Sequence, residues 1–502
     1  MLSKIISGTL EGIEINKVIV ESDLSYGLPV FTLVGLADLT VKESKERIRS
    51  ALINSGYSLP DDKITVNLSP ADTKKIGSHF DLAITMGILF AKRKLEERKY
   101  NDFCFLGELS LDGNLIENDN LFALIIGLRE MGIKKFFIPK SFIKTLSVIT
   151  DTYFYPAKNL EEVCNHFFKD EKITPIYNET CEIKNNPEEV LDFADVYGQE
   201  EAKRAIEIAV AGRHNIAMIG SPGTGKSMLS KRVPYIMPDL TYDEMIEITK
   251  IYSIADELKS VGSLITKRPF RNPHHSASHT ALLGGGAKAR PGEITLAHNG
   301  VLFLDELTEF SKYTLDNLRE PLETGDISIS RAGAKNKYPA AFMLVSAMNP
   351  CPCGYYGHPK KHCICSETAR LKYMSKVSGP LLDRIDIKLN IAHIDYKKIG
   401  NGVGGKSSKD MKEKINIALK FQEKRYKNLN FKYNSKIPDS RIKKICHLDN
   451  EINKILEMAY DKYSFSARGI NKILKVARTI ADMDESENIR KSDVLEAINY
   501  RV

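Results

Sequence analysis

The segment Gly220-Ser-Pro-Gly-Thr-Gly-Lys226-Ser227 constrains the fold more than any other, because it has the spacing of a phosphate-binding loop. An apolar segment, Asn-Ile-Ala-Met-Ile, precedes it, and a helical pattern, Met-Leu-Ser-Lys-Arg, follows it. Glycines let backbone N–H groups curl around phosphate oxygens, and the helix presents its positive end to them. The residues predicted to line the phosphates are Gly220, Ser221, Pro222, Gly223, Thr224, Gly225, Lys226 and Ser227.

The chemistry of this loop predicts two specific roles and a partner strand. Lys226 is expected to reach the β- and γ-phosphates of ATP, and Ser227 to ligate Mg²⁺. The segment Val301-Leu-Phe-Leu-Asp305-Glu306 puts two carboxylates at the end of a buried strand, where ligands of α/β sheets bind. We expect Asp305 to hold Mg²⁺ through water and Glu306 to polarise the attacking water.

A third apolar segment, Phe342-Met-Leu-Val-Ser-Ala-Met348, ends directly before Asn349. The Asn349 amide is predicted to bridge the γ-phosphate and the lytic water, although an Asn before Pro is more often a turn residue. This assignment depends on the order of the strands.

Length and composition place these motifs in a multidomain globular protein. The chain has 502 residues, 42% of them hydrophobic and 27% charged, which predicts roughly two to four domains. No apolar run is long enough to span a bilayer, and the N-terminus lacks the pattern of a signal peptide. We therefore expect a cytoplasmic protein without a membrane partner. The net charge of +7 permits nucleic-acid binding but does not demand it.

Changes in pattern along the chain predict three domains and a linker, at residues 1–168, 169–189 (linker), 190–395 and 396–502. In the first domain the expected strands are Ile13–Val20, Val30–Val34, Lys63–Leu68 and Phe103–Ser110. The expected helices are Thr40–Ser55 and Asp81–Ala91. In the domain at residues 190–395 the expected strands are Asn215–Gly220, Gly300–Leu304, Ala341–Ala347 and Ile385–Ile391. Near-continuous apolar strands separated by helices predict an α/β domain with a parallel sheet covered on both faces. The last segment is rich in helical patterns.

A second match to the phosphate-loop pattern occurs at Gly400-Asn-Gly-Val-Gly-Gly405-Lys406-Ser407. Polar residues precede it where a buried strand is required, and no acidic partner strand follows it. We interpret it as a glycine-rich connector, with Ser407-Ser-Lys-Asp as a helix cap.

Four of the eight cysteines form two C-x-C pairs, Cys351-Pro-Cys353 and Cys363-Ile-Cys365. Four thiolates in a short loop match a tetrahedral structural Zn²⁺ site, which has no open position for substrate. His358 and His362 lie between the pairs as possible substitutes. The alternative is a group of reduced cysteines without metal.

With these pieces in order the chain resembles the AAA+ ATPases, and among them the magnesium-chelatase-like ComM/YifB proteins. The resemblance covers essentially the whole chain. The matching segments are Asp195-Val-Tyr-Gly-Gln199, Gly292–Glu306, Gly325–Gly333, Leu381-Leu-Asp-Arg384-Ile-Asp386, Phe465-Ser-Ala-Arg468-Gly and Ala477-Arg-Thr-Ile-Ala-Asp482. The implied fold is a P-loop AAA+ domain with a helical lid, preceded by an α+β Lon-protease-like (S5-type) domain.

The resemblance assigns roles to residues outside the phosphate loop. Val196 and Gly198 match the adenine pocket. Arg384 resembles the arginine finger that reaches the γ-phosphate of a neighbouring subunit, and Arg468 resembles the sensor arginine of the lid. Both fit the chemistry, because charge on the transferring phosphoryl group needs cationic donors. A finger acting in trans requires a ring, so a homohexamer is expected; the alternative for either arginine is a surface ion pair.

The resemblance also implies two insertions that face the pore of the ring. Arg331, Lys335 and Lys337 lie on a predicted hairpin, where basic side chains would follow a DNA backbone without reading bases. The alternative is a solvated hairpin tip. Phe270-Arg271-Asn-Pro-His274-His275 resembles the second insertion, and we do not interpret its two histidines as metal ligands.

The N-terminal segment resembles the Lon protease without its catalytic pair. Lys75-Ile-Gly77-Ser78-His79-Phe80-Asp81 resembles the segment that carries the catalytic serine, but His79 stands at that place and Ser78 one residue early. Gly107–Gly113 matches as well, yet Leu121-Phe-Ala-Leu124 stands where Lon has its lysine. A Ser/Lys mechanism needs that amine, so we expect a non-proteolytic scaffold or binding module.

Three functions follow from these features. The first is a ring-forming motor that moves branched or single-stranded DNA, a branch-migration helicase in homologous recombination or natural transformation. The second is a chelatase subunit that drives insertion of a metal into a porphyrin, which the cysteine cluster and the N-terminal domain disfavour. The third is an ATP-dependent protease, which the absent Ser/Lys pair disfavours.

Overall fold

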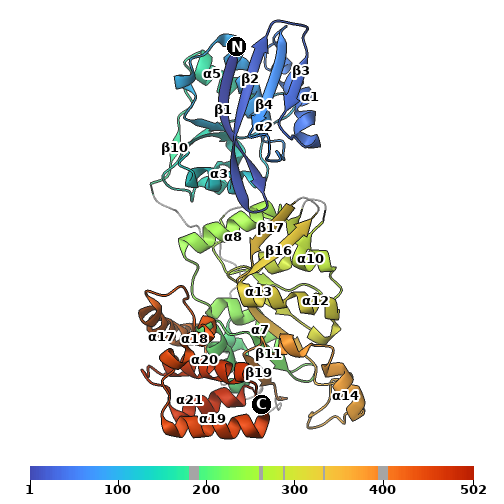
Figure 1. The fold of residues 1–502 in the computed structure, drawn as a ribbon, viewed down its shortest axis with the longest axis vertical. Coiled ribbons are helices and arrows are strands. Elements are labelled where there is room, and N and C mark those ends of the chain that lie inside the picture. The colour runs from blue at the N-terminus through green and yellow to red at the C-terminus, as the bar shows by residue number, and fades with distance from the viewer. Residues whose placement is uncertain (180–190, 259–263, 287–288, 332–333, 394–404, 502) are drawn as a thin grey trace. The chain divides into compact units, whose positions relative to one another are not determined.

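The computed structural model describes residues 1–179, 191–258, 264–286, 289–331, 334–393 and 405–501, and Figure 1 shows its helices and strands. The contacts within the chain divide it into two units, and neither unit is continuous in sequence. Unit 1 comprises Met1–Asn186, Tyr242–Thr266 and Ser330–Lys337. Unit 2 comprises Pro187–Thr241, Lys267–Ile329 and Tyr338–Val502. The predicted domain boundaries stay a prediction.

Unit 1 is built on a mixed eight-stranded sheet in the order β10-β9-β8-β5-β1-β2-β4-β3. Its strands are β1 (Leu2–Glu11), β2 (Glu14–Ser25), β3 (Phe31–Val34), β4 (Lys63–Ser69), β5 (Phe103–Phe105), β8 (Lys135–Pro139), β9 (Tyr153–Ala157) and β10 (Ile176–Tyr177), with a separate pair β6 (Glu108–Leu109) and β7 (Leu115–Ile116). The antiparallel β1–β2 hairpin turns at Gly12, whose φ of +63° suits glycine. Ile5 faces Val20 across this hairpin, and both are buried in the core.

The helices of unit 1 come from two parts of the chain. They are α1 (Leu39–Asn54), α2 (Phe80–Arg93), α3 (Asn120–Glu130), α4 (Ile143–Leu146), α5 (Leu160–Phe168) and α8 (Tyr242–Ile254). Helix α8 comes from the middle of the chain and packs on α3. Its Ser253 hydroxyl donates to the Asp119 carbonyl and accepts from the Ala123 N–H at 3.3 Å, so it satisfies backbone groups where α3 begins.

Unit 2 contains a five-stranded sheet in the order β12-β15-β18-β11-β19, and all of its strands are parallel. These strands are β12 (Phe270–Arg271), β15 (Val301–Leu304), β18 (Met343–Met348), β11 (Ile216–Ile219) and β19 (Ile387–Asn390). Every residue of β15 and β18 is buried, as the near-continuous apolar runs predicted. The predicted parallel sheet is therefore confirmed.

The helices of unit 2 before its C-terminal region are α6 (Glu200–Gly212), α7 (Lys226–Ile236), α10 (His279–Leu283), α11 (Glu293–Leu296), α12 (Lys312–Asn317), α13 (Arg319–Thr324), α14 (Glu367–Met374) and α15 (Gly379–Leu382). Two short hairpins are also present, β13 (Gly284–Gly285) with β14 (Arg290–Pro291), and β16 (Asp326–Arg331) with β17 (Ala334–Pro339). In β17, Asn336 lies against Gly12 of the β1–β2 turn, and these two residues belong to unit 1.

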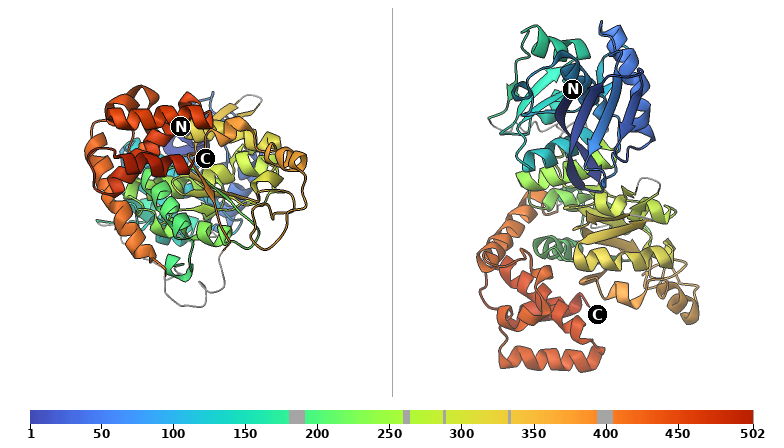
Figure 2. Two further views of the ribbon diagram at one scale, coloured as in Figure 1. Left: turned by 90° about the horizontal axis from the view of Figure 1, so that it is seen from below. Right: turned by 45° about the horizontal axis from the view of Figure 1, so that its top comes forward.

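The C-terminal helices are α17 (Ser408–Tyr426), α18 (Asp439–Ile445), α19 (Asn450–Tyr463), α20 (Ala467–Met483) and α21 (Lys491–Asn499). They gather on one side of unit 2, as the orange-red and red ribbons in Figure 2 show. Helices α17 and α20 pack on α6, and the three share one hydrophobic core with the parallel sheet. Among the described residues, no helix is both long and apolar enough to cross a bilayer.

A buried ionic network joins the C-terminal helices. Asp482 is fully buried and accepts hydrogen bonds from Arg425 Nη1 at 2.8 Å, Arg478 Nε at 3.1 Å and Asn434 Nδ2 at 2.9 Å. Removal of one partner from such a network leaves a buried charge without compensation. The network is therefore expected to be essential for packing α17 on α20.

Replacement of Asp482 by Ala is expected to lower the free energy of unfolding of unit 2 by about 3–5 kcal/mol, because the buried Arg478 and the partly exposed Arg425 lose their buried counterion. Asp484→Ala is the matched control: its carboxylate pairs with Arg204 and Arg490 at the surface, and such pairs are worth about 0–1 kcal/mol. Urea denaturation of both variants measures the difference. Equal midpoints would contradict the structural role given to Asp482.

Candidate nucleotide site

The predicted phosphate loop lies between β11 and α7, so its location is that required of the motif. Gly223 and Gly225 have φ values of +81° and +88°, which only glycine adopts without strain. Lys226 begins α7, and its Nζ donates to the Gly220 carbonyl at 2.6 Å and the Ser221 carbonyl at 3.0 Å. The loop thus folds around the ammonium group. Burial lowers the pKa of Lys226 below its usual value, and the nearby Asp305 carboxylate opposes this shift.

The other strand ends bring the predicted partners to this loop. Strand β18 lies between β11 and β15, so the residues that follow the three strands meet at one edge of the sheet. Ser227 Oγ donates to Asp305 Oδ2 at 2.7 Å, and Asn349 Oδ1 lies 3.4 Å from Lys226 Nζ. A hydroxyl and a carboxylate in contact form the oxygen donor set that Mg²⁺ prefers. Lys226, Ser227, Asp305 and Asn349 therefore form one cluster.

Glu306 lies at the exposed side of this cluster, with its backbone in the left-handed region at φ +52°. A non-glycine residue in that region carries strain of about 1–3 kcal/mol, and such strain concentrates at functional sites. His275 Nδ1 lies 3.4 Å from Glu306 Oε2. Sequence reasoning set aside His275 as a metal ligand and missed this contact, because nothing in the spacing links residues so far apart in the chain.

The predicted adenine segment lies beside the phosphate loop. Val196 is buried, and Gly198 has a φ of +67° in the turn before α6. Gln199 Nε2 donates to the Thr224 carbonyl at 3.2 Å and to the Ala392 carbonyl at 2.8 Å. The turn is therefore fixed to the phosphate loop and to the end of β19.

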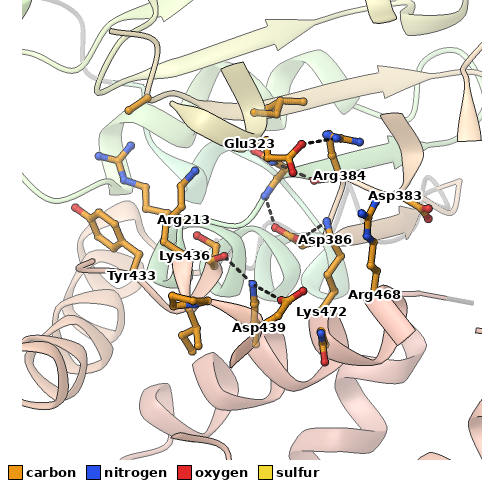
Figure 3. Close-up of a pocket in the computed structure, with 18 of the residues that line it drawn as sticks. Arg213, Glu323, Asp383, Arg384, Asp386, Tyr433, Lys436, Asp439, Arg468 and Lys472 are labelled. Carbon is orange, nitrogen blue, oxygen red and sulfur yellow. Dashed lines mark hydrogen bonds and ion pairs between the residues drawn. The ribbon is translucent and has the colours of Figure 1, made fainter. Parts of the chain in front are cut away.

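The two predicted arginines lie elsewhere, in a separate pocket of about 410 Å³. Figure 3 shows Arg384 beside Glu323, with Arg468 on the same side of the pocket. Arg384 donates to the Arg319 carbonyl at 3.2 Å and the Pro380 carbonyl at 2.9 Å, and it pairs with Glu323. The hydrogen bond from Arg384 to the Glu323 carboxylate, together with the positive charge of Arg384, holds the pKa of Glu323 below its usual range. The structure brings the two arginines together, and it places neither in the Lys226 cluster.

This pocket lies at the amino ends of the parallel strands. Asn215 precedes β11, and its carbonyl accepts the Asp386 N–H just before β19. Asp386 is buried and pairs with Lys472 at 2.6 Å and His214 at 3.4 Å. Burial opposes ionisation of Asp386, yet Lys472 and His214 hold its pKa well below the usual range. The remaining basic residues of the lining are Arg213, Lys436 and Lys475.

The four cysteines of the two C-x-C pairs converge. Their sulfur atoms all lie within 4.8 Å of one another, with Cys351 Sγ 3.4 Å from Cys353 Sγ and 3.6 Å from Cys363 Sγ. Tetrahedral Zn²⁺ with bonds of about 2.3 Å places its sulfur ligands about 3.8 Å apart. Cys351 Sγ also accepts the Tyr356 N–H at 3.4 Å. The arrangement fits a four-coordinate metal, with Cys365 as the fourth ligand.

Two further predictions concern segments that the structure describes in part. Arg331 and Lys335 lie on β16 and β17 with side chains outside the described residues, and Lys337 is exposed on β17. In the second glycine-rich match, residues 400–404 lie outside the described residues. Its Lys406 pairs with Glu207, and Ser407 caps α17, which confirms the predicted helix cap.

Known proteins resemble this chain along nearly its whole length. Three family profiles match the chain: "Magnesium chelatase, subunit ChlI" at residues 192–399, "Subunit ChlI of Mg-chelatase" at 20–141 and "Magnesium chelatase, subunit ChlI C-terminal" at 405–501. The chain is 41% identical to YifB of Escherichia coli K12 over 499 residues, which cover 98% of this chain and 95% of that protein.

Two further relatives separate the full-length likeness from a partial one. The chain is 40% identical to the competence protein ComM of Haemophilus influenzae, again over 98% of this chain and 95% of that protein. The magnesium-chelatase subunit ChlI of Olisthodiscus luteus is 25% identical over 34% of this chain and 54% of its own length. The chain therefore belongs to the ComM/YifB family of magnesium-chelatase-like AAA+ proteins.

Proposed function

We propose that this protein hydrolyses ATP as a homohexameric ring and moves DNA, acting as a branch-migration helicase in homologous recombination or natural transformation. The observation that carries the proposal is the convergence of Lys226, Ser227, Asp305 and Asn349 at one sheet edge. The name of the competence relative from Haemophilus influenzae supports the link to transformation.

Each residue at this edge has a distinct task in ATP hydrolysis. Lys226 binds the β- and γ-phosphates, and Glu306 polarises the lytic water that Asn349 helps to orient. Ser227 and Asp305 would hold Mg²⁺, which would supply positive charge against the phosphate oxygens. The hydrogen bonds of Lys226 Nζ to the Gly220 and Ser221 carbonyls hold the ammonium within the phosphate loop.

The separate location of the arginine pocket supports a ring. The four residues of β11 span about 13 Å between its amino end, where Arg384 lies, and its carboxyl end, where the phosphate loop begins. An arginine at the amino edge cannot reach the phosphates of its own subunit over that distance. Arg384, and with it Arg468, would act on a nucleotide held by a neighbour, in a head-to-tail interface that closes into a ring.

The four cysteines are proposed to hold one structural Zn²⁺ per chain. Four thiolates and no open position are typical of structural rather than catalytic zinc.

The alternative functions receive less support. The magnesium-chelatase subunit ChlI of Olisthodiscus luteus aligns with 34% of this chain, whereas YifB of Escherichia coli aligns with 98% of it. For a Lon-like protease, Ser78 donates to Glu108, and the buried Lys75 Nζ donates to the Thr73 carbonyl at 2.7 Å and to the Pro70 carbonyl. These two side chains are each engaged elsewhere, which supports a non-proteolytic N-terminal domain.

The expected result of the functional test is an ATPase whose rate rises with DNA, most with a four-way junction. Single-stranded, duplex and junction DNA are compared at fixed salt, because phosphate contacts weaken steeply with ionic strength. Replacement of Arg331, Lys335 and Lys337 together by Ala should bring the DNA-stimulated rate down towards the DNA-free rate.

The matched control removes three positive charges elsewhere, at the exposed Arg441, Lys443 and Lys444 of α18. Loss of stimulation in both variants would assign the effect to net charge rather than to the hairpin. An ATPase indifferent to every DNA would overturn the DNA motor.

A further inference from the structure

The segment Cys351–Cys365, which carries the four cysteines and is called the cysteine loop, touches the phosphate loop directly. The peptide after Cys353 turns at Gly354, which is buried and has a φ of +81°. A Cβ atom placed on Gly354 would lie 2.7 Å from Pro222 Cδ and 2.9 Å from Pro222 Cγ. Carbon atoms in contact lie about 3.5–4.0 Å apart, so a side chain at this position would collide with Pro222. The lack of a side chain at Gly354 therefore lets the cysteine loop approach the middle of the phosphate loop.

The first metal ligand also continues from a residue of the nucleotide site. Asn349 lies two residues before Cys351 and 3.4 Å from Lys226 Nζ. Cys351 is buried, and its sulfur accepts the Tyr356 N–H. The Asn349–Cys351 segment therefore runs from the ammonium that binds phosphate to the thiolate cluster without an intervening loop.

The last of the four cysteines is connected through α14 to the segment that follows β15. Cys365 precedes Ser366, whose hydroxyl caps α14 by accepting the Ala369 N–H. At the other end of α14, the Tyr373 hydroxyl accepts a hydrogen bond from Thr308 at 2.5 Å. Thr308 follows Glu306 by two residues, so α14 connects the cluster to the segment that carries the proposed water-polarising carboxylate.

A side-chain contact connects the middle of the cysteine loop to α14. The Arg370 guanidinium of α14 lies 3.9 Å from the centre of the Tyr356 ring, which is a cation–π contact. The Lys361 ammonium lies 4.6 Å from the centre of the Tyr355 ring within the same loop. Four bonds to a metal would in addition fix Cys351 and Cys353 relative to Cys363 and Cys365.

We infer that the metal held by the four cysteines positions the phosphate loop and the Glu306 segment relative to each other, so that loss of the metal weakens nucleotide binding and turnover. This inference rests on the proposed ATPase function. Cys351, Cys353, Cys363 and Cys365 are ligands, and Gly354 and Tyr373 are positioning residues that transmit the arrangement.

The test begins with metal analysis of the full-length protein, which should contain about one zinc per chain. Zinc is then withdrawn with a zinc-selective chelator, the chelator is removed, and binding of a fluorescent ATP analogue is measured in excess Mg²⁺. The zinc-free protein should bind the analogue on the order of 10-fold more weakly and recover on addition of zinc. Because a displacement of about 1 Å at a reacting centre can cost on the order of 10²-fold in rate, kcat should fall as well.

Two glycine variants test the contact without removing a ligand. Gly354→Ala should keep its zinc and lower kcat/KM on the order of 10–100-fold, because the new methyl group displaces Pro222. Gly357→Ala is the matched control: it lies in the same loop with a similar φ of +76°, but nothing lies within 4 Å of the place that its methyl group would take. It carries the same backbone strain without the collision and should retain zinc and nucleotide binding.

A third variant completes a double-mutant cycle. Pro222→Ala removes the two ring atoms that the new methyl group meets, so Gly354→Ala should have a smaller effect in that background than in the natural protein. Equal effects in the two backgrounds, or equal behaviour of Gly354→Ala and Gly357→Ala, would overturn the inference.

The outcomes separate this inference from the proposed function. Zinc-loaded and zinc-free proteins that bind nucleotide equally would overturn the coupling and leave the ATPase intact. A zinc-loaded protein that binds no nucleotide would overturn both. If the zinc-free chain unfolds, as circular dichroism would reveal, the glycine variants decide the question because they keep the metal. Protein purified without chelators and free of zinc would also overturn the inference.

Discussion

Lys226→Ala protein is expected to lose ATP binding, whereas Glu306→Gln protein should bind ATP and hydrolyse it on the order of 10²–10⁴ times more slowly. Lys226 supplies the buried cation of the phosphate loop, so its removal leaves the phosphates without their main counter-charge. Glu306 lies outside that loop, and its amide replacement removes the group that polarises water. Nucleotide binding and phosphate release are measured on each variant.

Glu309→Gln provides the control for the second variant, because it removes a carboxylate three residues away whose contact is a surface pair with Lys376. It should hydrolyse ATP at close to the natural rate. If Glu306→Gln also turned over at that rate, a different strand would supply the water-polarising group, and the assignment of β15 would be wrong.

A mixture of two inactive proteins, Arg384→Ala and Glu306→Gln, should regain ATPase activity. In a head-to-tail ring, an Arg384→Ala subunit supplies Glu306, and its Glu306→Gln neighbour supplies Arg384, so that interface is complete. With random assembly, about a quarter of the interfaces are of this kind, which sets the scale of recovery. The gain should increase with protein concentration, because assembly is a mass-action step, and should increase further with DNA.

Mixing Arg384→Ala with Arg468→Ala tells whether both arginines act on the neighbour's nucleotide. If both reach across the interface, every interface in this mixture lacks one of them and activity stays low. Recovery would instead place Arg468 at the nucleotide of its own subunit, against the shared pocket described above. If the first mixture stayed inactive while rings formed and exchanged subunits, Arg384 would not be a trans-acting finger, and Arg331 would be the next candidate.

Much of the nucleotide site was predictable because its signals are local. Strands β11, β15, β18 and β19 lie within the predicted apolar segments. Strand β11 leads into the phosphate loop, β15 ends next to Asp305, and β18 ends next to Asn349. A parallel sheet places such residues at one edge, so the meeting of Ser227 with Asp305 follows from strand type alone. The convergence of the four cysteines likewise follows from their short spacing.

The features that the sequence did not predict depend on contacts between segments that are far apart in the chain. Strand β1 was not predicted, although it pairs along its whole length with β2. Its sequence mixes Ser, Lys, Gly and Thr with the apolar residues, so period-two alternation is weak, and pairing in the sheet determines its conformation. The pocket that holds Arg384 with Arg468, and the approach of Gly354 to Pro222, also arise only from tertiary packing.

The discontinuity of the two units has a consequence for the inheritance of this architecture. The chain passes from one unit to the other five times, since α8 and the tip of the β16–β17 hairpin are encoded inside the AAA+ segment but belong to unit 1. Helix α8 buries Met245, Ile248 and Ile251 and packs on α3 of the N-terminal region. A gene fusion or deletion at the first crossing would give the catalytic half an apolar helix without its partner. Recombination at that point would therefore not exchange one complete unit for another. Substitutions in α3 and α8 are expected to be coupled, because the two helices pack on each other.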